Sequence, residues 1–200
     1  MYTSKEMQVV AVTNRRLCYR PFPEQLEMVC QTHPAFIILR EKDLPEQDYK
    51  KLAAQVLELC HSYKVPCVLH TYPDAARALG CTSIHLPLPL LRTYAHELDG
   101  FTQIGSSVHS VEDAIEAENL GATYVTAGHV YVTDCKKGLA PRGLDFLRNV
   151  CESVSIPVYA IGGIQLATDT HKIAPDQAGE IASCGARGGC IMSGMMQFTP

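Results

Sequence analysis

The sequence predicts a TIM-type α/β barrel, and three observations predict it. Short apolar runs alternate with longer amphipathic stretches along the whole 200-residue chain. The runs are largely apolar and often β-branched, which is typical of parallel strands that are covered on both faces. Eight such runs occur, and eight strands joined by right-handed helical crossovers close naturally into a barrel. A flavodoxin-like open sheet is the alternative, although open sheets of that type usually have fewer strands.

The predicted elements run through the chain without a linker. The strands are Val9–Thr13, Phe36–Leu39, Cys67–Leu69, Ser83–Leu86, Thr102–Ser106, Tyr124–Ala127, Val158–Ile161 and Gly189–Met192. Two of the intervening stretches, Pro45–Tyr63 and Ser110–Leu120, have apolar residues at helical spacing. The second begins with a serine three residues before Asp113, a variant of the capping box. Since no change in composition divides the chain, we expect residues 1–200 to form a single barrel domain.

The end of the chain is unusual for this fold. Only Ser193–Pro200 follow the last predicted strand, which is shorter than a normal closing helix of about ten residues. We therefore expect the closing helix to be short or missing. The outer face of that strand would be covered by a partner subunit in a homodimer, by the residues before the first strand, or by a further C-terminal segment.

Composition and charge argue against several classes of protein. Hydrophobic residues make up 46% and charged residues 19% of the chain, with a net charge of −4 and no basic stripe, so nucleic acid is not an expected partner. Neither an export signal nor an apolar run of about 18 residues is present, so no membrane partner and a cytoplasmic location are expected. The nine cysteines, which lack Cys-x-x-Cys spacing, are then expected to be reduced thiols. A zinc site built from scattered Cys and His residues is the less favoured alternative.

Charged residues follow the second predicted strand, at the end of a barrel where ligands bind. Arg40 and Lys42 stand on either side of Glu41. An arginine provides a bidentate fork for carboxylate or phosphate, and a lysine adds a mobile charge. We interpret the two cations as an anion-binding pair, and a solvated charge cluster is the plainer alternative.

Glycine-containing loops follow the seventh and eighth predicted strands. The first contains Gly162 and Gly163, and the second reads Met192-Ser193-Gly194. Glycines let a phosphate approach backbone N–H groups, and these two loops are the usual phosphate site of this fold. The pattern favours a phosphorylated ligand, and tight turns are the alternative role for the glycines.

The long loop after the sixth predicted strand carries the main candidate for proton transfer. His129 lies at the end of that strand, where an imidazole can exchange protons near neutral pH. Thr133 and Lys136, further along the loop, are suited to hold an anionic substrate. His70 and His109 also lie near strand ends, and each is a candidate acid, base or packing residue.

Three motifs make the resemblance to a known family specific. They are Gly105–Ser110 (GSSVHS), Gly128–Leu139 (GHVYVTDCKKGL) and Ile156–Gly163 (IPVYAIGG). With them, the stretch from Val9 to Gly194 resembles the thiamin phosphate synthase superfamily, and most closely its TenI branch, the thiazole tautomerases. The resemblance implies a TIM barrel, in agreement with the strand count.

The same resemblance implies that two chemistries must be distinguished. Thiamin phosphate synthases join a pyrimidine diphosphate to a thiazole phosphate with magnesium, and they have Asn-Asp after the third strand and an Asp after the fourth. Here the first pair is His70-Thr71, and residues 87–90 contain no carboxylate. Synthases also have proline in place of His129 and threonine in place of Cys135. Because magnesium prefers oxygen ligands, we expect no metal, no other cofactor and no synthase activity.

The tautomerase branch has histidine at the position of His129, where it is the proposed acid and base. The resemblance therefore implies an isomerase that converts a carboxythiazole phosphate from its ylidene tautomer to the aromatic thiazole, by moving a proton between two carbons. The expected partner is a small phosphorylated thiazole. The expected substrate-binding residues are Arg40, Lys42, His70, Ser107, Thr133, Lys136, Gly163, Met192 and Ser193.

Two alternatives to the tautomerase remain open. The chain differs from the tautomerases at His70, where they keep asparagine, and in its short C-terminus. A barrel altered in this way could bind thiazole or thiamin phosphate without catalysis. The other alternative is thiamin phosphate synthase activity, against which the missing carboxylates argue.

Overall fold

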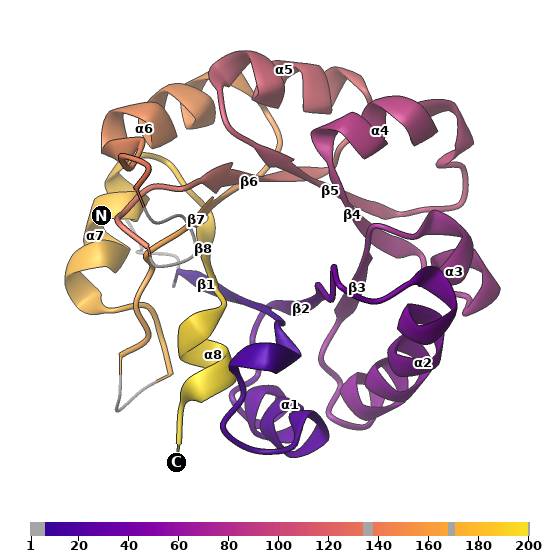
Figure 1. Ribbon diagram of the computed structural model, residues 1–200. Coiled ribbons are helices and arrows are strands. Elements are labelled where there is room, and N and C mark those ends of the chain that lie inside the picture. Colours follow the sequence, from indigo (N-terminus) through magenta and orange to yellow (C-terminus); the bar gives the residue numbers. More distant parts are fainter. Residues whose placement is uncertain (1–6, 134–137, 168–170, 200) are drawn as a thin grey trace.

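The computed structural model describes residues 7–133, 138–167 and 171–199, which form a closed barrel (Figure 1). Eight parallel strands are hydrogen-bonded in sequence order, and the eighth pairs with the first. The strands are β1 (Gln8–Val12), β2 (Phe36–Leu39), β3 (Cys67–His70), β4 (Ser83–Pro87), β5 (Gln103–Val108), β6 (Tyr124–Gly128), β7 (Val158–Ile161) and β8 (Gly188–Ile191). The predicted TIM barrel is confirmed, and the open-sheet alternative is wrong.

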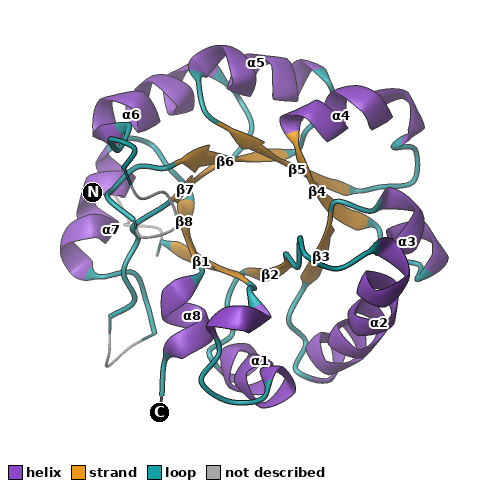
Figure 2. Ribbon diagram, viewed as in Figure 1, coloured by secondary structure: helices purple, strands orange, loops and turns teal. Residues whose placement is uncertain are grey.

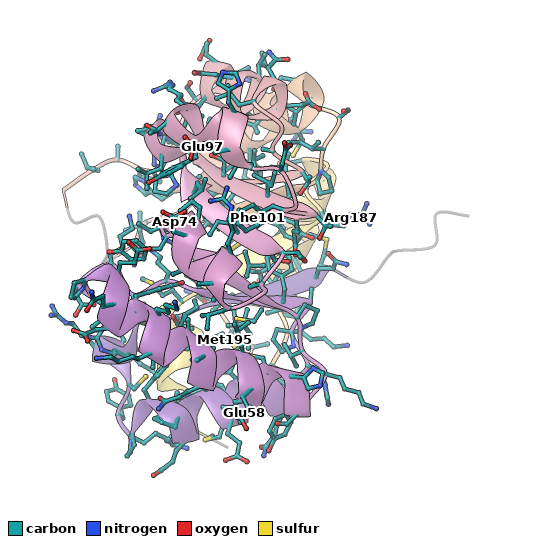
Figure 3. All side chains as sticks on the ribbon, turned by 90° about the vertical axis from the view of Figure 1, so that its right-hand side faces the viewer. Glu58, Asp74, Glu97, Phe101, Arg187 and Met195 are labelled. Carbon is teal, nitrogen blue, oxygen red and sulfur yellow. The ribbon has the colours of Figure 1, made fainter. Side chains whose placement is uncertain are left out.

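Helices surround the ring of strands (Figure 2). They are α1 (Phe22–Gln31), α2 (Glu46–Ser62), α3 (Pro73–Ala78), α4 (Leu88–Tyr94), α5 (Val111–Asn119), α6 (Gly143–Ser153), α7 (Pro175–Ser183) and α8 (Ser193–Gln197). The predicted cap of α5 is present, because Asp113 N–H donates to Ser110 Oγ at 3.0 Å. Viewed from the side, polar side chains such as Glu58 on α2 point away from the barrel (Figure 3).

Aromatic side chains fill the interior of the barrel near the amino ends of its strands. Phe36, Tyr124 and Tyr159 are buried there and meet edge to face, with ring centroids 5.3–5.8 Å apart. Such an arrangement suits the quadrupoles of aromatic rings. Since this end is packed with side chains, space for a ligand remains at the carboxyl ends of the strands, as is usual for this fold.

The C-terminal helix α8 has five residues, so the prediction of a short closing helix is confirmed. In Figure 1 it lies beside α1, and Gln25 of α1 holds it by donating to the carbonyl oxygen of Met195 at 2.9 Å. Met195 and Met196 are fully buried. Helix α1 therefore packs against the short closing helix, at the place where the sequence did not decide which element covers the end of the barrel.

The helices and cysteines of the described residues bear on two expectations from composition. None of its helices combines the length and the apolar character needed to cross a membrane. Its cysteines, Cys135 excluded because it lies outside the described residues, carry free thiols. Buried thiols such as Cys190 in β8 behave as small apolar core residues.

Candidate active site

A cavity of about 990 Å³ opens at the carboxyl ends of the strands. Its volume is that of a typical small-molecule site. Most of the predicted site residues line it, namely Arg40, Lys42, Ser107, His129, Thr133, Gly163, Met192 and Ser193. His70 is not among the lining residues, and Lys136 lies outside the described residues.

A buried carboxylate organises the cationic side of the cavity. Glu41 is 2% exposed and accepts hydrogen bonds from Thr13 Oγ1 at 2.7 Å and from the backbone N–H of Arg15 at 3.0 Å. Arg15 Nη1 also donates to this carboxylate at 3.0 Å, and the Arg40 N–H donates to Thr13 Oγ1. Glu41 is thus a buried structural residue that holds the segments after β1 and β2 together. Its neighbours Arg40 and Lys42 both line the cavity.

Glycine is required at both positions after β7, because the backbone has a positive φ there and because the loop after β6 comes close. Gly162 and Gly163 have φ of 96° and 74°, a region that other residues rarely adopt. A Cβ on Gly162 would lie 2.3 Å from His129 Cβ, and one on Gly163 would lie 2.4 Å from the carbonyl oxygen of Val132. The Tyr131 N–H donates to the Gly162 carbonyl at 3.0 Å. These glycines let the loop after β6 fold over the end of β7.

His129 is buried against the cavity that it lines. Its side chain is 6% exposed, and neither ring nitrogen has a hydrogen-bond partner among the described residues. Buried polar groups are nearly always hydrogen-bonded, so an imidazole without a partner at a cavity wall indicates a group that serves a ligand. The position is the one that the sequence predicts for this residue.

The other two candidate histidines differ from each other. His109 lines the cavity and donates from Nδ1 to the Gly128 carbonyl at 2.7 Å. His70 is buried and does not line the cavity; its ring is stacked on His85 with ring centroids 5.5 Å apart and bonded to Thr71 Oγ1. Burial lowers the pKa of His70 well below its usual range. His70 is therefore not among the predicted residues that line the cavity, and its contact with substrate stays a prediction.

Sequence reasoning missed a polar network beneath Ser107. Thr126, which also lines the cavity, is 3.3 Å from Ser107 Oγ. His85 joins Ser107 Oγ through Nε2 at 2.8 Å and the Tyr124 hydroxyl through Nδ1 at 3.0 Å. Alternate residues of a strand face the barrel interior, so the polar side chains at alternate positions of β5 and β6 are the signal that would have found it.

The residues of the cavity do not fit a magnesium ion held by the protein. Among the described lining residues Asp113 is the one carboxylate. Its Oδ2 accepts a hydrogen bond from the backbone N–H of His109 at 2.9 Å. At the positions where the resemblance expects metal-binding carboxylates stand His70, Thr71 and residues 87–90, none of them acidic. The described part of the chain contains no group of three or more His, Cys, Asp or Glu residues arranged to hold a metal.

The fold and the position of the cavity define the class of protein, a TIM barrel with a cavity at the carboxyl ends of its strands, where barrels of this kind bind their ligands. The family model described as thiamine monophosphate synthase matches residues 9–195, and the chain belongs to this family. The chain is 31% identical to a thiamine-phosphate synthase of Clostridium acetobutylicum, over 96% of this chain and 88% of the relative. It is 30% identical to the thiamine-phosphate synthase of Pyrococcus furiosus, over 98% and 90% of the two chains. A solved structure of thiamine phosphate pyrophosphorylase from the same organism superimposes with a TM-score of 0.77, at 30% identity, over 95% of this chain and 88% of that one.

These comparisons correct the assignment to the TenI branch. The relatives, at 27–34% identity, carry the name thiamine-phosphate synthase, and the superimposed structure is named thiamine phosphate pyrophosphorylase. The predicted assignment to the thiazole tautomerases is therefore wrong, and the isomerase reaction predicted from it is withdrawn. The resemblance to the superfamily as a whole is confirmed.

Proposed function

We propose that this chain is a thiamine phosphate synthase, an enzyme that couples a pyrimidine diphosphate to a thiazole phosphate and releases diphosphate. The family match over residues 9–195 supports the proposal. The observation that carries it is the pairing, in one cavity, of the cations after β2 with the glycine-containing loops after β7 and β8. A reaction between two phosphorylated substrates requires two places for anions, and this cavity offers both.

The cations after β2 are assigned to the diphosphate. Arg40 remains charged at any physiological pH and can hold two oxygens at once, and Lys42 adds a second charge. A departing diphosphate gains negative charge in the transition state, so fixed cations beside it lower the barrier. Lys136, predicted from the sequence to bind an anion, belongs to the loop whose middle lies outside the described residues.

The glycine-containing loops are assigned to the thiazole phosphate. The N–H of Gly163 and the hydroxyl of Ser193 are the donors, because glycine allows a phosphate oxygen to come close to the backbone. Thr133 and His129 line the same cavity and are assigned to the polar atoms of the rings. Met192 supplies an apolar, adaptable wall beside them.

The proposal is tested by incubating the purified chain with both phosphorylated precursors and measuring thiamine phosphate by chromatography. We expect product, and we expect Arg40→Gln to lower the rate about thirtyfold or more, since a lost charge–phosphate contact costs about 2 kcal/mol or more. Arg16→Gln is the matched control, because Arg16 pairs with Asp43 and is 70% exposed in its side chain. The proposal fails if the chain makes no product under conditions in which the Pyrococcus furiosus relative does.

A second candidate function is binding of thiazole phosphate or thiamine phosphate without turnover. The observation that favours it is the neutral pair His70 and Thr71 at a position where the resemblance expects a metal-binding carboxylate. Calorimetry distinguishes the two functions. Tight binding of thiamine phosphate together with no product in the coupling assay would favour the binding protein.

A further inference from the structure

Three neighbouring strands place a tyrosine and a histidine on either side of a glycine inside the barrel. Gly105 of β5 pairs in register with His85 of β4 and with Tyr124 of β6. A Cβ on Gly105 would lie 2.3 Å from the Tyr124 hydroxyl oxygen and 2.4 Å from His85 Nδ1. The glycine therefore leaves the space in which the hydroxyl and the imidazole meet, 3.0 Å apart.

Two residues further along β5 and β6, the same network reaches the cavity. Ser107 and Thr126 pair in register, and their hydroxyl oxygens are 3.3 Å apart. His85 Nε2 lies 2.8 Å from Ser107 Oγ. Both hydroxyl side chains line the cavity. A continuous series of hydrogen bonds thus runs from Tyr124, deep in the barrel, to the wall where a ligand binds.

The imidazole of His85 is neutral. It is 1% exposed, and burial lowers its pKa to about 3, with Lys42 and Arg40 adding to the effect. A neutral imidazole has one N–H donor and one acceptor nitrogen. Its two hydrogen bonds must therefore have opposite directions, so the bond to Tyr124 decides the direction of the bond to Ser107.

Burial of Tyr124 decides that direction. Within the described residues His85 is the one hydrogen-bond partner of the Tyr124 hydroxyl, which is buried and whose pKa burial raises well above its usual value. Were His85 to donate to Tyr124, the hydroxyl hydrogen would be buried without an acceptor, which is unfavourable. Tyr124 therefore donates to His85 Nδ1, and His85 Nε2–H donates to Ser107.

This direction fixes what the hydroxyl pair offers to a ligand. Ser107 accepts from His85, and the bond between Ser107 and Thr126 uses one of their two hydroxyl hydrogens. Whichever of the two donates in that bond, one hydrogen remains for the cavity. We propose that Tyr124 and His85 are positioning residues that make the Ser107–Thr126 pair a hydrogen-bond donor, so that this subsite recognises a phosphate or diphosphate oxygen. The choice of ligand rests on the proposed function, whereas the direction of the hydrogen bonds does not.

The direction is tested without any ligand by nitrogen-15 NMR of the full chain, with the His85 signals assigned by their loss in His85→Gln. The expected result is a neutral ring with hydrogen on Nε2 and none on Nδ1, unchanged between pH 7 and about pH 5 because the pKa is low. A ring with hydrogen on Nδ1 would overturn the proposal, whatever the outcome of the coupling assay.

The effect on binding is tested by titrating pyrophosphate and inorganic phosphate separately. Tyr124→Phe is expected to weaken at least one of them about fivefold, the loss typical of a disturbed hydrogen bond. Tyr159→Phe is the matched control, because Tyr159 belongs to the same aromatic cluster and its hydroxyl donates to Gln8 Oε1 at 2.6 Å, away from Ser107. The probe that weakens identifies the monophosphate or the diphosphate as the anion at this subsite.

A double-mutant cycle separates positioning from general destabilisation. If Tyr124 acts through Ser107, Tyr124→Phe has no further effect on affinity in the Ser107→Ala background. The proposal is overturned if Tyr124→Phe weakens binding equally in both backgrounds, if Tyr159→Phe has the same effect as Tyr124→Phe, or if neither anion responds to Tyr124→Phe.

Discussion

Thr71 adopts a backbone conformation that β-branched residues rarely occupy. Its φ is 75°, and it follows β3 with its N–H donating to the His85 carbonyl at 3.1 Å. Aspartate and asparagine accept a positive φ more readily than threonine does. The resemblance to the superfamily places an aspartate here in synthases. The position therefore tolerates an acidic residue on backbone grounds, although this chain has none.

Replacing Thr71 tests whether its neutral side chain limits metal binding. In the unchanged chain we expect magnesium to leave the affinity for pyrophosphate the same or lower, because the residues at the expected metal positions are neutral. Thr71→Asp is expected to make magnesium raise that affinity about tenfold, since one carboxylate plus substrate phosphates can hold this ion. Thr71→Asn is the control with the same shape and no charge. A magnesium-dependent gain of tenfold in the unchanged chain, measured by calorimetry, would contradict the expectation.

Individual site residues could be predicted from the sequence where a strand end alone decides their position. Arg40 directly follows β2 and Ser193 lies two residues after β8, and the barrel brings all strand ends to one mouth. His70 could not be assigned in this way, because β3 extends through it and its buried side chain is not among those that line the cavity. Thr126 was missed because it lies inside a strand, where its direction depends on the alternation of side chains.

At the scale of elements, every predicted strand is present, with bounds within two residues of those observed. The largest difference is in β5, predicted to end at Ser106 and observed to end at Val108. Apolar runs reveal strands that are buried on both faces, whereas the last part of β5 contains the polar Ser107, which lines the cavity. The part of the strand that carries function is thus the part that hydrophobicity does not indicate.

The close packing of β4, β5 and β6 predicts the effect of a single added methyl group. Gly105→Ala would place a Cβ 2.1 Å from Tyr124 Cζ, so we expect the free energy of unfolding to fall by about 3 kcal/mol. Gly179→Ala is the control, because a Cβ there meets nothing within 4 Å on helix α7 and should stabilise the chain by about 1 kcal/mol. Urea unfolding of both variants measures the difference. Equal stability of the two variants would mean that Gly105 is not packed as described.

At the scale of the whole molecule, the barrel explains why distant segments of sequence form one site. The cations after β2 and the loops after β7 and β8 are separated by more than half of the chain, yet β8 pairs with β1 and β1 with β2. Closure of the sheet brings these strand ends together. Counting strands was sufficient to predict this, because eight parallel strands have few other ways to bury both faces.

The branch of the family could not be derived from the local motif. The tautomerase branch was predicted from His129 and from the missing carboxylates, which are a few positions around the site, whereas similarity over residues 9–195 reports the whole chain. A histidine at a cavity wall can orient a ring, accept a hydrogen bond or transfer a proton, and its chemistry depends on the ligand beside it. Sequence alone therefore predicted the place of the site better than its reaction.

A crystal structure of the chain with thiazole phosphate and pyrophosphate together tests the central claim most directly. The account predicts both anions in the one cavity, the thiazole phosphate within about 3.2 Å of the Gly163 N–H and the Ser193 hydroxyl, and pyrophosphate against Arg40 and Lys42. Binding of either anion outside the cavity, or competition of both for one position, would contradict a site that holds two phosphorylated substrates at once.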